Sequence, residues 1–328
     1  MPDRISALRQ WLQDELGFSD YGLEPASSDA SFRRYFRIQR AGRSYIVMDA
    51  PPGQEDCRPF IQVTHLLFDL GLNVPELLES DPERGFLLLG DLGDRPYLPA
   101  LDEQTVDRLY GDALAALAVM QACGPNDARL PPYDRALLLR EMALFPEWLL
   151  QTHLGLGLDD GQQQRLEETF TLLVENALEQ PRVFVHRDYH SRNLMVMDAN
   201  NPGILDYQDA VVGPVTYDLV SLLRDCYIRW PRTRVEDWAL GYRELARQSG
   251  ILREEVDEAQ FLRWFDRMGA QRHLKAAGIF ARLHHRDGKP GYLADIPRTL
   301  GYIVEVAEQD PALAFLGELI REQVLPRL

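Results

Sequence analysis

The sequence predicts an α+β fold of two lobes, a small β-rich lobe over residues 1–92 and a larger helical lobe over residues 93–328. The first observation is an alternation of apolar and polar residues along 31–38, followed by a second strand pattern along 43–48. The second is that, after a break at residues 90–94, apolar residues recur at helical spacing, as in Val106, Leu109, Ala113, Leu117 and Met120.

The same patterns place the elements of each lobe. Residues 56–70 carry an apolar stripe that indicates a helix, and Gly71 is a suitable stop. Residues 85–89 indicate a short buried strand that leads into the break, where we expect a hinge. In the second lobe, strand signals occur only at residues 182–186, 194–197 and 203–206. We therefore expect one hairpin embedded among helices.

Composition narrows the class of protein. The 51 acidic and 35 basic residues give a formal charge of −16, which disfavours nucleic acid and anionic membranes as partners. No stretch approaches the ~18 apolar residues of a membrane span. The cysteines are far apart, without a CxxC pair, so a reducing compartment fits better than a disulfide framework: Cys57, Cys123 and Cys226. We expect a cytoplasmic protein without an obligate protein partner.

One polar stretch follows the apolar residues 183–185, and it reads HRDYHSRN over His186–Asn193. A hairpin after this stretch would fold Asp206 back toward Asn193, so that three oxygen-bearing side chains converge, Asp188 included. Phosphoryl transfer needs such a set. One carboxylate accepts the proton of the attacking hydroxyl, while an amide oxygen and a second carboxylate suit Mg²⁺, which prefers oxygen ligands. We expect Asp188 to be the base and Asn193 and Asp206 to be the metal ligands.

The segment His-x-Asp-x4-Asn, with an aspartate 13 residues after Asn193, resembles the catalytic segment of protein-kinase-like enzymes. His190 stands where protein kinases have a lysine, and in this it resembles the aminoglycoside phosphotransferase family. The resemblance implies a protein-kinase-like bilobal fold with ATP between the lobes. It also implies that His190 steadies the γ-phosphate beside Asp188.

The expected nucleotide contacts lie in the first lobe. Ser28 and Ser31 flank the turn between the first two strands, where backbone N–H groups can face phosphates. Protein kinases have a lysine on the third strand, but Met48 stands there and no lysine precedes Lys275. An arginine therefore takes over the charge, or the protein is an inactive pseudokinase; the candidates are Arg33, Arg34 and Arg43. The hinge backbone is expected to contact adenine through Leu89, Asp91 and Leu92.

The acceptor is expected to be a small molecule, because Gly213 comes only seven residues after Asp206, which leaves too little chain for a peptide-binding platform. Residues 29–37, 45–52 and 271–290 resemble one branch of the family, which contains a kinase of the anomeric hydroxyl of N-acetylmuramate and N-acetylglucosamine in bacterial cell-wall recycling. That resemblance implies an amino sugar as substrate, and the expected contacts to it are Asp188, His190, Asp209 and Arg272. Arg272 is the candidate partner for the lactyl carboxylate of muramate.

Several alternatives remain open at this point. Another small acceptor, such as an aminoglycoside, choline or homoserine, would fit the same catalytic segment. A catalytically inactive nucleotide-binding protein would explain the missing lysine, although it need not retain Asp188, Asn193 and Asp206 together. A zinc pair at His186 and His190 is disfavoured because the preceding strand makes a helix there improbable.

Overall fold

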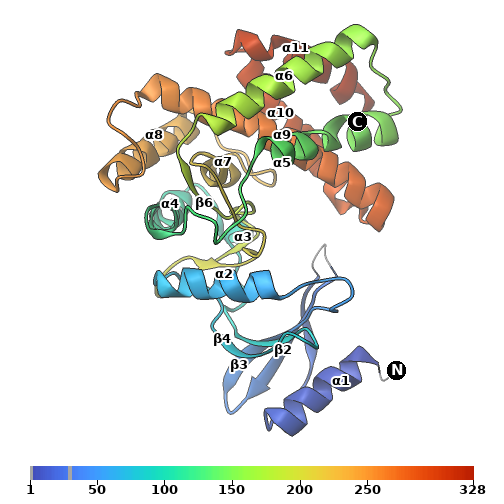
Figure 1. Ribbon diagram of the computed structural model, residues 1–328, viewed down its shortest axis with the longest axis vertical. Helices are drawn as coiled ribbons and strands as arrows, with labels where there is room; N and C mark the ends of the chain where they lie inside the picture. Colours follow the sequence, from blue (N-terminus) through green and yellow to red (C-terminus); the bar gives the residue numbers. More distant parts are fainter. Residues whose placement is uncertain (1–2, 29–31) are drawn as a thin grey trace. The chain divides into compact units, whose positions relative to one another are not determined.

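The computed structural model describes residues 3–28 and 32–328. They form two compact units (Figure 1). The first unit runs to Arg95 and includes Met195–Asp209, and the second comprises Pro96–Leu194 and Ala210–Leu328. Asp206 thus belongs to the first unit, although most of the chain between Arg95 and Asp206 belongs to the second. The lobe boundary after residue 92 stays a prediction, and it differs from this division in the placement of residues 93–95 and 195–209.

The first unit is built on an antiparallel sheet of five strands in the order β1-β2-β3-β5-β4. The alternating stretches predicted at 31–38 and 43–48 correspond to β2 and β3, and the predicted helix at 56–70 corresponds to α2, Arg58–Asp69. The strands are β1 Glu24–Ser28, β2 Arg34–Arg40, β3 Arg43–Asp49, β4 Leu77–Asp81 and β5 Phe86–Gly90.

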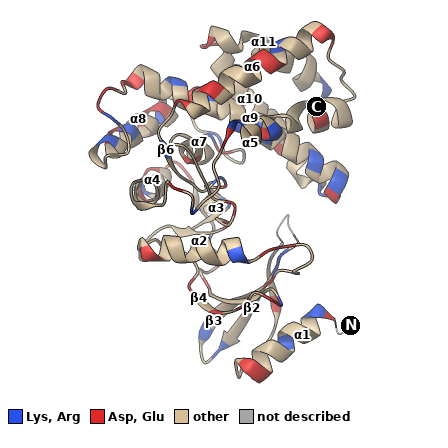
Figure 2. Ribbon diagram, in the orientation of Figure 1, with Lys and Arg blue, Asp and Glu red and all other residues tan. Residues whose placement is uncertain are grey.

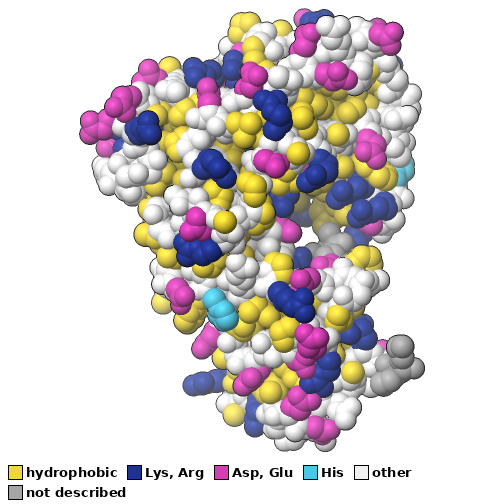
Figure 3. Space-filling model, viewed as in Figure 1, with side chains coloured by type: hydrophobic (Ala, Val, Ile, Leu, Met, Phe, Trp, Pro, Cys, Tyr) yellow, Lys and Arg dark blue, Asp and Glu magenta, His cyan; other side chains and the backbone are white. Residues whose placement is uncertain are grey.

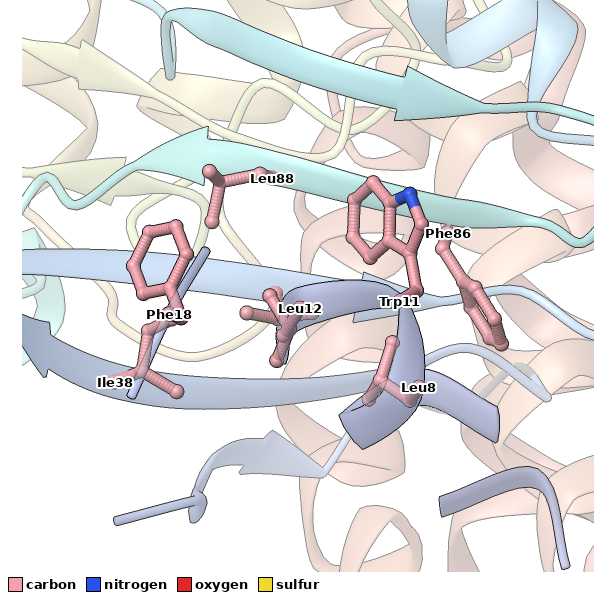
Figure 4. Close-up of a cluster of buried hydrophobic side chains, with 8 residues drawn as sticks. Leu8, Trp11, Leu12, Phe18, Ile38, Phe86 and Leu88 are labelled. Atoms are coloured by element: carbon pink, nitrogen blue, oxygen red, sulfur yellow. The ribbon is translucent and has the colours of Figure 1, made fainter. Parts of the chain in front are cut away.

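An N-terminal helix covers one face of this sheet. Helix α1, Arg4–Gln10, continues into a π-helical turn, Trp11–Glu15. Phe86 and Leu88 are two residues apart on β5, so both point to the same face of the sheet. There they join a buried cluster with residues from α1, the turn, the segment after it, β2 and β3 (Figure 4): Leu8, Trp11, Leu12, Phe18, Ile38 and Val47. Full burial of one such side chain contributes about 1.5–3 kcal/mol, so this cluster attaches the N-terminal segment to the sheet.

Residues 195–209 complete the first unit. Strands β7, Leu194–Met195, and β8, Gly203–Ile204, form the predicted hairpin. The N–H of Ile204 donates to the carbonyl of Asn73 at 2.8 Å. The Tyr207 ring stacks on Phe60 of α2 with centroids 5.1 Å apart, and its hydroxyl lies 2.9 Å from the Thr64 hydroxyl. A segment distant in sequence is therefore part of the α2 side of this unit.

The second unit is mainly helical, and α9, Glu258–Asp287, is its longest helix, with 30 residues. It packs against α6, α7, α10 and the π-helical segment Phe145–His153. Gly278 allows the last of these contacts, since a Cβ there would lie 2.4 Å from the Leu144 carbonyl carbon. The other helices are α3 Tyr97–Ala100, α4 Val106–Cys123, α5 Arg135–Met142, α6 Asp160–Leu178, α7 Tyr217–Leu223, α8 Arg232–Gln248, α10 Ile296–Ala307 and α11 Ala314–Leu319.

Two short strands lie among these helices. Strand β6, Arg182–Val185, pairs antiparallel with β9, Val211–Pro214. The polar stretch from His186 begins directly after β6. Acidic and basic residues are interspersed along α8 (Figure 2), where Arg232 pairs with Glu236 at 2.7 Å. Among the residues that the structure describes, no helix is both long and apolar enough to cross a membrane.

Candidate active site

In the second unit, the loop after β6 is fixed at its start by Asp218 of α7. The backbone N–H groups of His186 and Arg187 donate to the two oxygens of this carboxylate at 2.6 and 3.0 Å. Burial raises the pKa of Asp218 to about 7, although the two N–H donors lower it. Arg187 has a φ of +77°, which is uncommon for a residue other than glycine. These hydrogen bonds hold the loop in a conformation that it would otherwise rarely adopt.

The same loop is fixed further along by Asp225. The N–H of Ser191 donates to this carboxylate at 3.0 Å, and the Ser191 hydroxyl is bonded to it as well. The other oxygen of Asp225 accepts from the N–H of Tyr227 at 3.0 Å. Two buried aspartates therefore position the loop from opposite ends of the segment 218–225.

Asp188 lies in this loop among cationic groups. Burial alone would raise the pKa of its carboxyl group, but the charges of Lys275 and other basic groups outweigh that effect, and the pKa is below its usual value. The side chain is therefore a carboxylate at neutral pH. An ionised carboxylate can accept the hydrogen bond of an attacking hydroxyl and then its proton.

A buried ion-pair network supports these cations. Lys275 of α9 lies 3.1 Å from the Glu141 carboxylate and donates to the Tyr217 hydroxyl at 2.9 Å. Arg187 pairs with the same carboxylate. Sequence reasoning missed this role of Glu141 and Lys275. The signal available was that Lys275 is one of only two lysines in the chain.

Asn193 and His190 are also placed by local contacts. The Asn193 side-chain nitrogen donates to the Asp188 carbonyl at 3.0 Å, and an amide held by its nitrogen can present its oxygen to a metal ion. Burial lowers the pKa of His190 more than Asp225 and Asp188 raise it. The neutral imidazole can donate one hydrogen bond. Its ring meets the Tyr227 ring edge-on, with centroids 5.4 Å apart.

Arg272, the predicted partner of a substrate carboxylate, is mostly buried in α9, with 6% of its surface exposed. Its guanidinium nitrogen contacts the Cys226 sulfur at 3.7 Å. Its charge also helps to lower the pKa of Asp188. The structure thus brings Arg272 into the surroundings of Asp188, and it adds a supporting role that the sequence did not indicate.

In the first unit, Asp206 has a φ of +63°, in the left-handed region that residues other than glycine seldom occupy. A nitrogen of Arg33 lies 3.7 Å from its carboxylate, and Gln208 donates to the same oxygen at 2.9 Å. Gln208 also donates to the exposed Asp209 at 3.4 Å. A cation is therefore placed next to a predicted metal ligand in a chain that lacks the strand lysine.

Arg34 points elsewhere, as expected for neighbouring residues on a strand. Its Nε donates to the Asp49 carboxylate at 3.0 Å, and Arg4 of α1 donates to the other oxygen at 2.9 Å. Asp49 is fully buried and lies on β3 directly after Met48. Arg34 thus links two strands and the N-terminal helix. Of the two arginines, Arg33 is the one oriented toward Asp206.

The remaining predicted nucleotide contacts lie at the end of β1 and in and after β5. Leu89 is buried in β5 and pairs with Ile46 on one side. The Asp91 carboxylate is occupied by Arg37 at 2.6 Å, by Ser44, and by the Gly93 N–H at 2.9 Å, so only its backbone remains for adenine. Leu92 is half-buried. Ser28 ends β1, and Ser31 lies outside the described residues.

Comparison with known proteins identifies the class. Residues 22–258 match the model of the phosphotransferase enzyme family, APH, and the chain belongs to this family. The predicted family and the predicted enzyme class, a phosphotransferase, are thereby confirmed.

Individual relatives are closer. The chain is 51% identical over 329 residues to the N-acetylmuramate/N-acetylglucosamine kinase of Pseudomonas putida, covering 97% of this chain and 96% of the relative. It is 52% identical to the kinase of the same name from Pseudomonas aeruginosa, covering 91% and 87%. Among solved structures, ADP-bound aminoglycoside phosphotransferase APH(2'')-Ib superposes with a TM-score of 0.60 at 14% identity, covering 90% of this chain and 97% of that one. This likeness confirms the predicted protein-kinase-like fold.

Proposed function

We propose that this protein is an ATP-dependent kinase that phosphorylates the anomeric hydroxyl of N-acetylmuramate and N-acetylglucosamine. The observation that carries the reaction is the ionised Asp188 in a loop whose backbone is fixed by Asp218 and Asp225. The substrate is inferred from the names of the relatives, since the identity of 51% extends over 97% of this chain.

In the proposed reaction, Asp188 accepts the proton of the anomeric hydroxyl as the hydroxyl oxygen attacks the γ-phosphorus of ATP. The ring oxygen makes an anomeric hydroxyl more acidic than an ordinary alcohol, so the difference in pKa between this hydroxyl and a carboxylate base is smaller. His190 donates a hydrogen bond to the transferred phosphoryl group. The leaving group is ADP, and the product is a sugar 1-phosphate.

The metal is proposed to be Mg²⁺, held by Asn193 and Asp206. One amide and one carboxylate form an all-oxygen donor set, which fits a hard divalent cation and not zinc. When bound, the ion would neutralise the charge on the phosphates. Arg33 adjoins Asp206 and is proposed to add the positive charge that the strand lysine supplies in protein kinases.

The remaining assignments follow from the same proposal. ATP would contact Ser28 and Ser31 with its phosphates and the backbone at Leu89, Asp91 and Leu92 with its adenine. Asp209 is exposed close to Asp206 in sequence and is proposed to contact the sugar. A kinase that consumes ATP for cell-wall recycling would act in the cytoplasm, and the charge of −16 does not favour nucleic acid as a partner.

An inactive nucleotide-binding protein is the main alternative, and an aminoglycoside, choline or homoserine kinase is the second. The position of Arg33 beside Asp206 argues against the first, because it offers a replacement for the missing lysine. The high identity to sugar kinases argues against the second.

The test is an ATP-consumption screen over both sugars, choline, homoserine and aminoglycosides, followed by phosphorus NMR of the product. We expect turnover of both sugars and a phosphate that mild acid releases, since a sugar 1-phosphate is acid-labile. An acid-stable phosphate on O6 would contradict the anomeric assignment. Turnover of choline without turnover of either sugar would contradict the substrate class.

A further inference from the structure

The catalytic loop contains an arginine that the reaction described above does not use. Arg192 follows Ser191 and precedes Asn193, and 42% of its side chain is exposed. Its guanidinium carbon lies 3.6 Å from the centroid of the Tyr227 ring and 5.7 Å from that of Tyr292. A cation over an aromatic face is held in place without losing its hydrogen-bond donors, which lie in the guanidinium plane. Arg192 is thus positioned but remains able to bind an anion.

The aromatic support is continuous with the catalytic residues. Tyr227 contacts the His190 ring on one side, and on the other its ring lies 6.2 Å from Phe280, which stacks on Tyr292 at 5.6 Å. The backbone of Tyr227 is fixed by Asp225, the same carboxylate that binds Ser191. Arg192 and the catalytic loop therefore share one rigid support.

The nearby carboxylate of Asp295 does not accept a hydrogen bond from Arg192. An oxygen of Asp295 lies 4.0 Å from the Arg192 guanidinium, beyond hydrogen-bond distance. Asp295 instead pairs with Arg298 at 2.7 Å. An exposed guanidinium with a distant, already engaged carboxylate is suited to a planar anionic group from a ligand, which it can bind through two parallel hydrogen bonds.

We infer that Arg192 binds the lactyl carboxylate of N-acetylmuramate and is the residue by which the enzyme recognises that sugar over N-acetylglucosamine. This inference rests on the proposed function. The two sugars differ only in the lactyl ether, so a cation at the edge of the catalytic loop affects one of them and not the other. It also reassigns the carboxylate contact from Arg272, which is buried against Cys226.

The test compares kcat/KM for the two sugars in the wild type and in Arg192→Met. We expect the ratio of N-acetylmuramate to N-acetylglucosamine to fall by about 10- to 100-fold, the range for loss of a charge-assisted hydrogen bond. Arg192→Lys should restore part of the ratio. Arg229→Met is the matched control, because Arg229 lies 5.1 Å over the Tyr302 ring, pairs with Glu305 and has a similar exposed fraction of 44%. The control should keep the wild-type ratio.

A second measurement also changes the substrate, so that the result does not rest on a variant alone. N-acetylmuramate with its lactyl carboxyl group converted to an amide should be a poorer substrate of the wild type, and Arg192→Met should handle the acid and the amide alike. An unchanged ratio in Arg192→Met would overturn the inference while leaving the proposed function intact. Absence of turnover of either sugar by the wild type would overturn the proposed function and this inference with it.

A different cluster carries an independent inference. Three of the seven histidines meet where the π-helical segment that ends at His153 packs against α9. Nδ1 of His153 lies 3.0 Å from Nε2 of His285. His284 also contributes, and one nitrogen from each ring lies within 4.8 Å of the others. Nδ1 of His284 is buried without a hydrogen-bond partner in the described part of the chain.

We propose that these three imidazoles bind one zinc-like transition-metal ion. Neutral imidazoles at such spacing need only small ring rotations to reach nitrogen–zinc distances of about 2.0–2.1 Å, with water as fourth ligand. Basic side chains gather over the same end of α9 (Figure 3), but Arg286 is paired with Asp287 at 2.9 Å, which offsets its charge. Such an ion would cross-link the end of α9 to the π-helical segment.

Calorimetric titration of the metal-free, untagged protein with zinc chloride tests this site. One zinc should bind per chain and raise the unfolding temperature. His153→Ala should weaken the binding by about tenfold or more. His65→Ala removes an exposed histidine of α2 and should bind zinc like the wild type. Equal weakening in both variants, or absence of a one-to-one site, would overturn the proposal.

Discussion

Asp188 shows how the protonation state of a single residue depends on its neighbours. An isolated buried carboxyl group tends to bind a proton, because burial disfavours its charge. Here Lys275 lowers the pKa, and Lys275 is itself kept charged by Glu141 despite its burial. Asp188 is thus a carboxylate, able to accept a proton, because a largely buried ion-pair network lies next to it.

The corresponding prediction is that Asp188→Asn will lose activity. An amide keeps the shape of the side chain but cannot take a proton, and loss of a general base costs about 10²–10⁴-fold in kcat. Nucleotide binding, measured by fluorescence or calorimetry, should persist. Near-wild-type turnover by this variant would remove Asp188 from the proposed mechanism.

At the scale of elements, the start of β2 places two neighbouring arginines, Arg33 and Arg34, in different surroundings. Arg34 connects β2 to β3 and α1 through the buried Asp49, whereas the preceding Arg33 faces Asp206. Alternation along an extended chain places neighbouring side chains on opposite faces. One face of this segment therefore contributes to the stability of the sheet, and the other contributes to the candidate site.

The different surroundings of the two arginines predict different effects for two matched variants. Arg34→Met should lower the free energy of unfolding by about 1–2 kcal/mol, since the buried Asp49 carboxylate loses one of its two arginine partners, both of which are partly exposed. Arg33→Met should instead raise KM for ATP while urea unfolding changes little. If Arg34→Met affected ATP and Arg33→Met affected stability, the two roles would be reversed.

At the scale of the whole molecule, the sequence was informative where patterns are local. Strand alternation located β2 and β3, and the spacing from Asp188 to Asn193 indicated the family. The family and the fold were confirmed by the comparisons. The catalytic roles, the nucleotide contacts and the sugar contacts stay predictions.

The features that the sequence did not reveal depend on contacts between distant residues. Glu141 and Lys275 are 134 positions apart, and no local pattern indicates that they pair. Similarly, Arg192 lies in the predicted catalytic segment, but its support by Tyr227 and Tyr292 depends on how α9 and the following residues pack. The choice between Arg33 and Arg34 depends on Asp49, which lies 15 positions from Arg34 and which no local pattern connects with it.

The discontinuity of the first unit has a consequence for how the protein is made. A ribosome delivers the chain from its N-terminus, and domains generally fold in that order. Here the five-stranded sheet is finished by residue 90, but the unit still lacks Tyr207, whose ring covers Phe60 and whose hydroxyl meets Thr64. The ribosome must therefore add more than a hundred further residues before this side of α2 is covered. A fragment that ends at the hinge would leave the same surface uncovered. The first unit is therefore complete only in a chain that also contains residues 195–209.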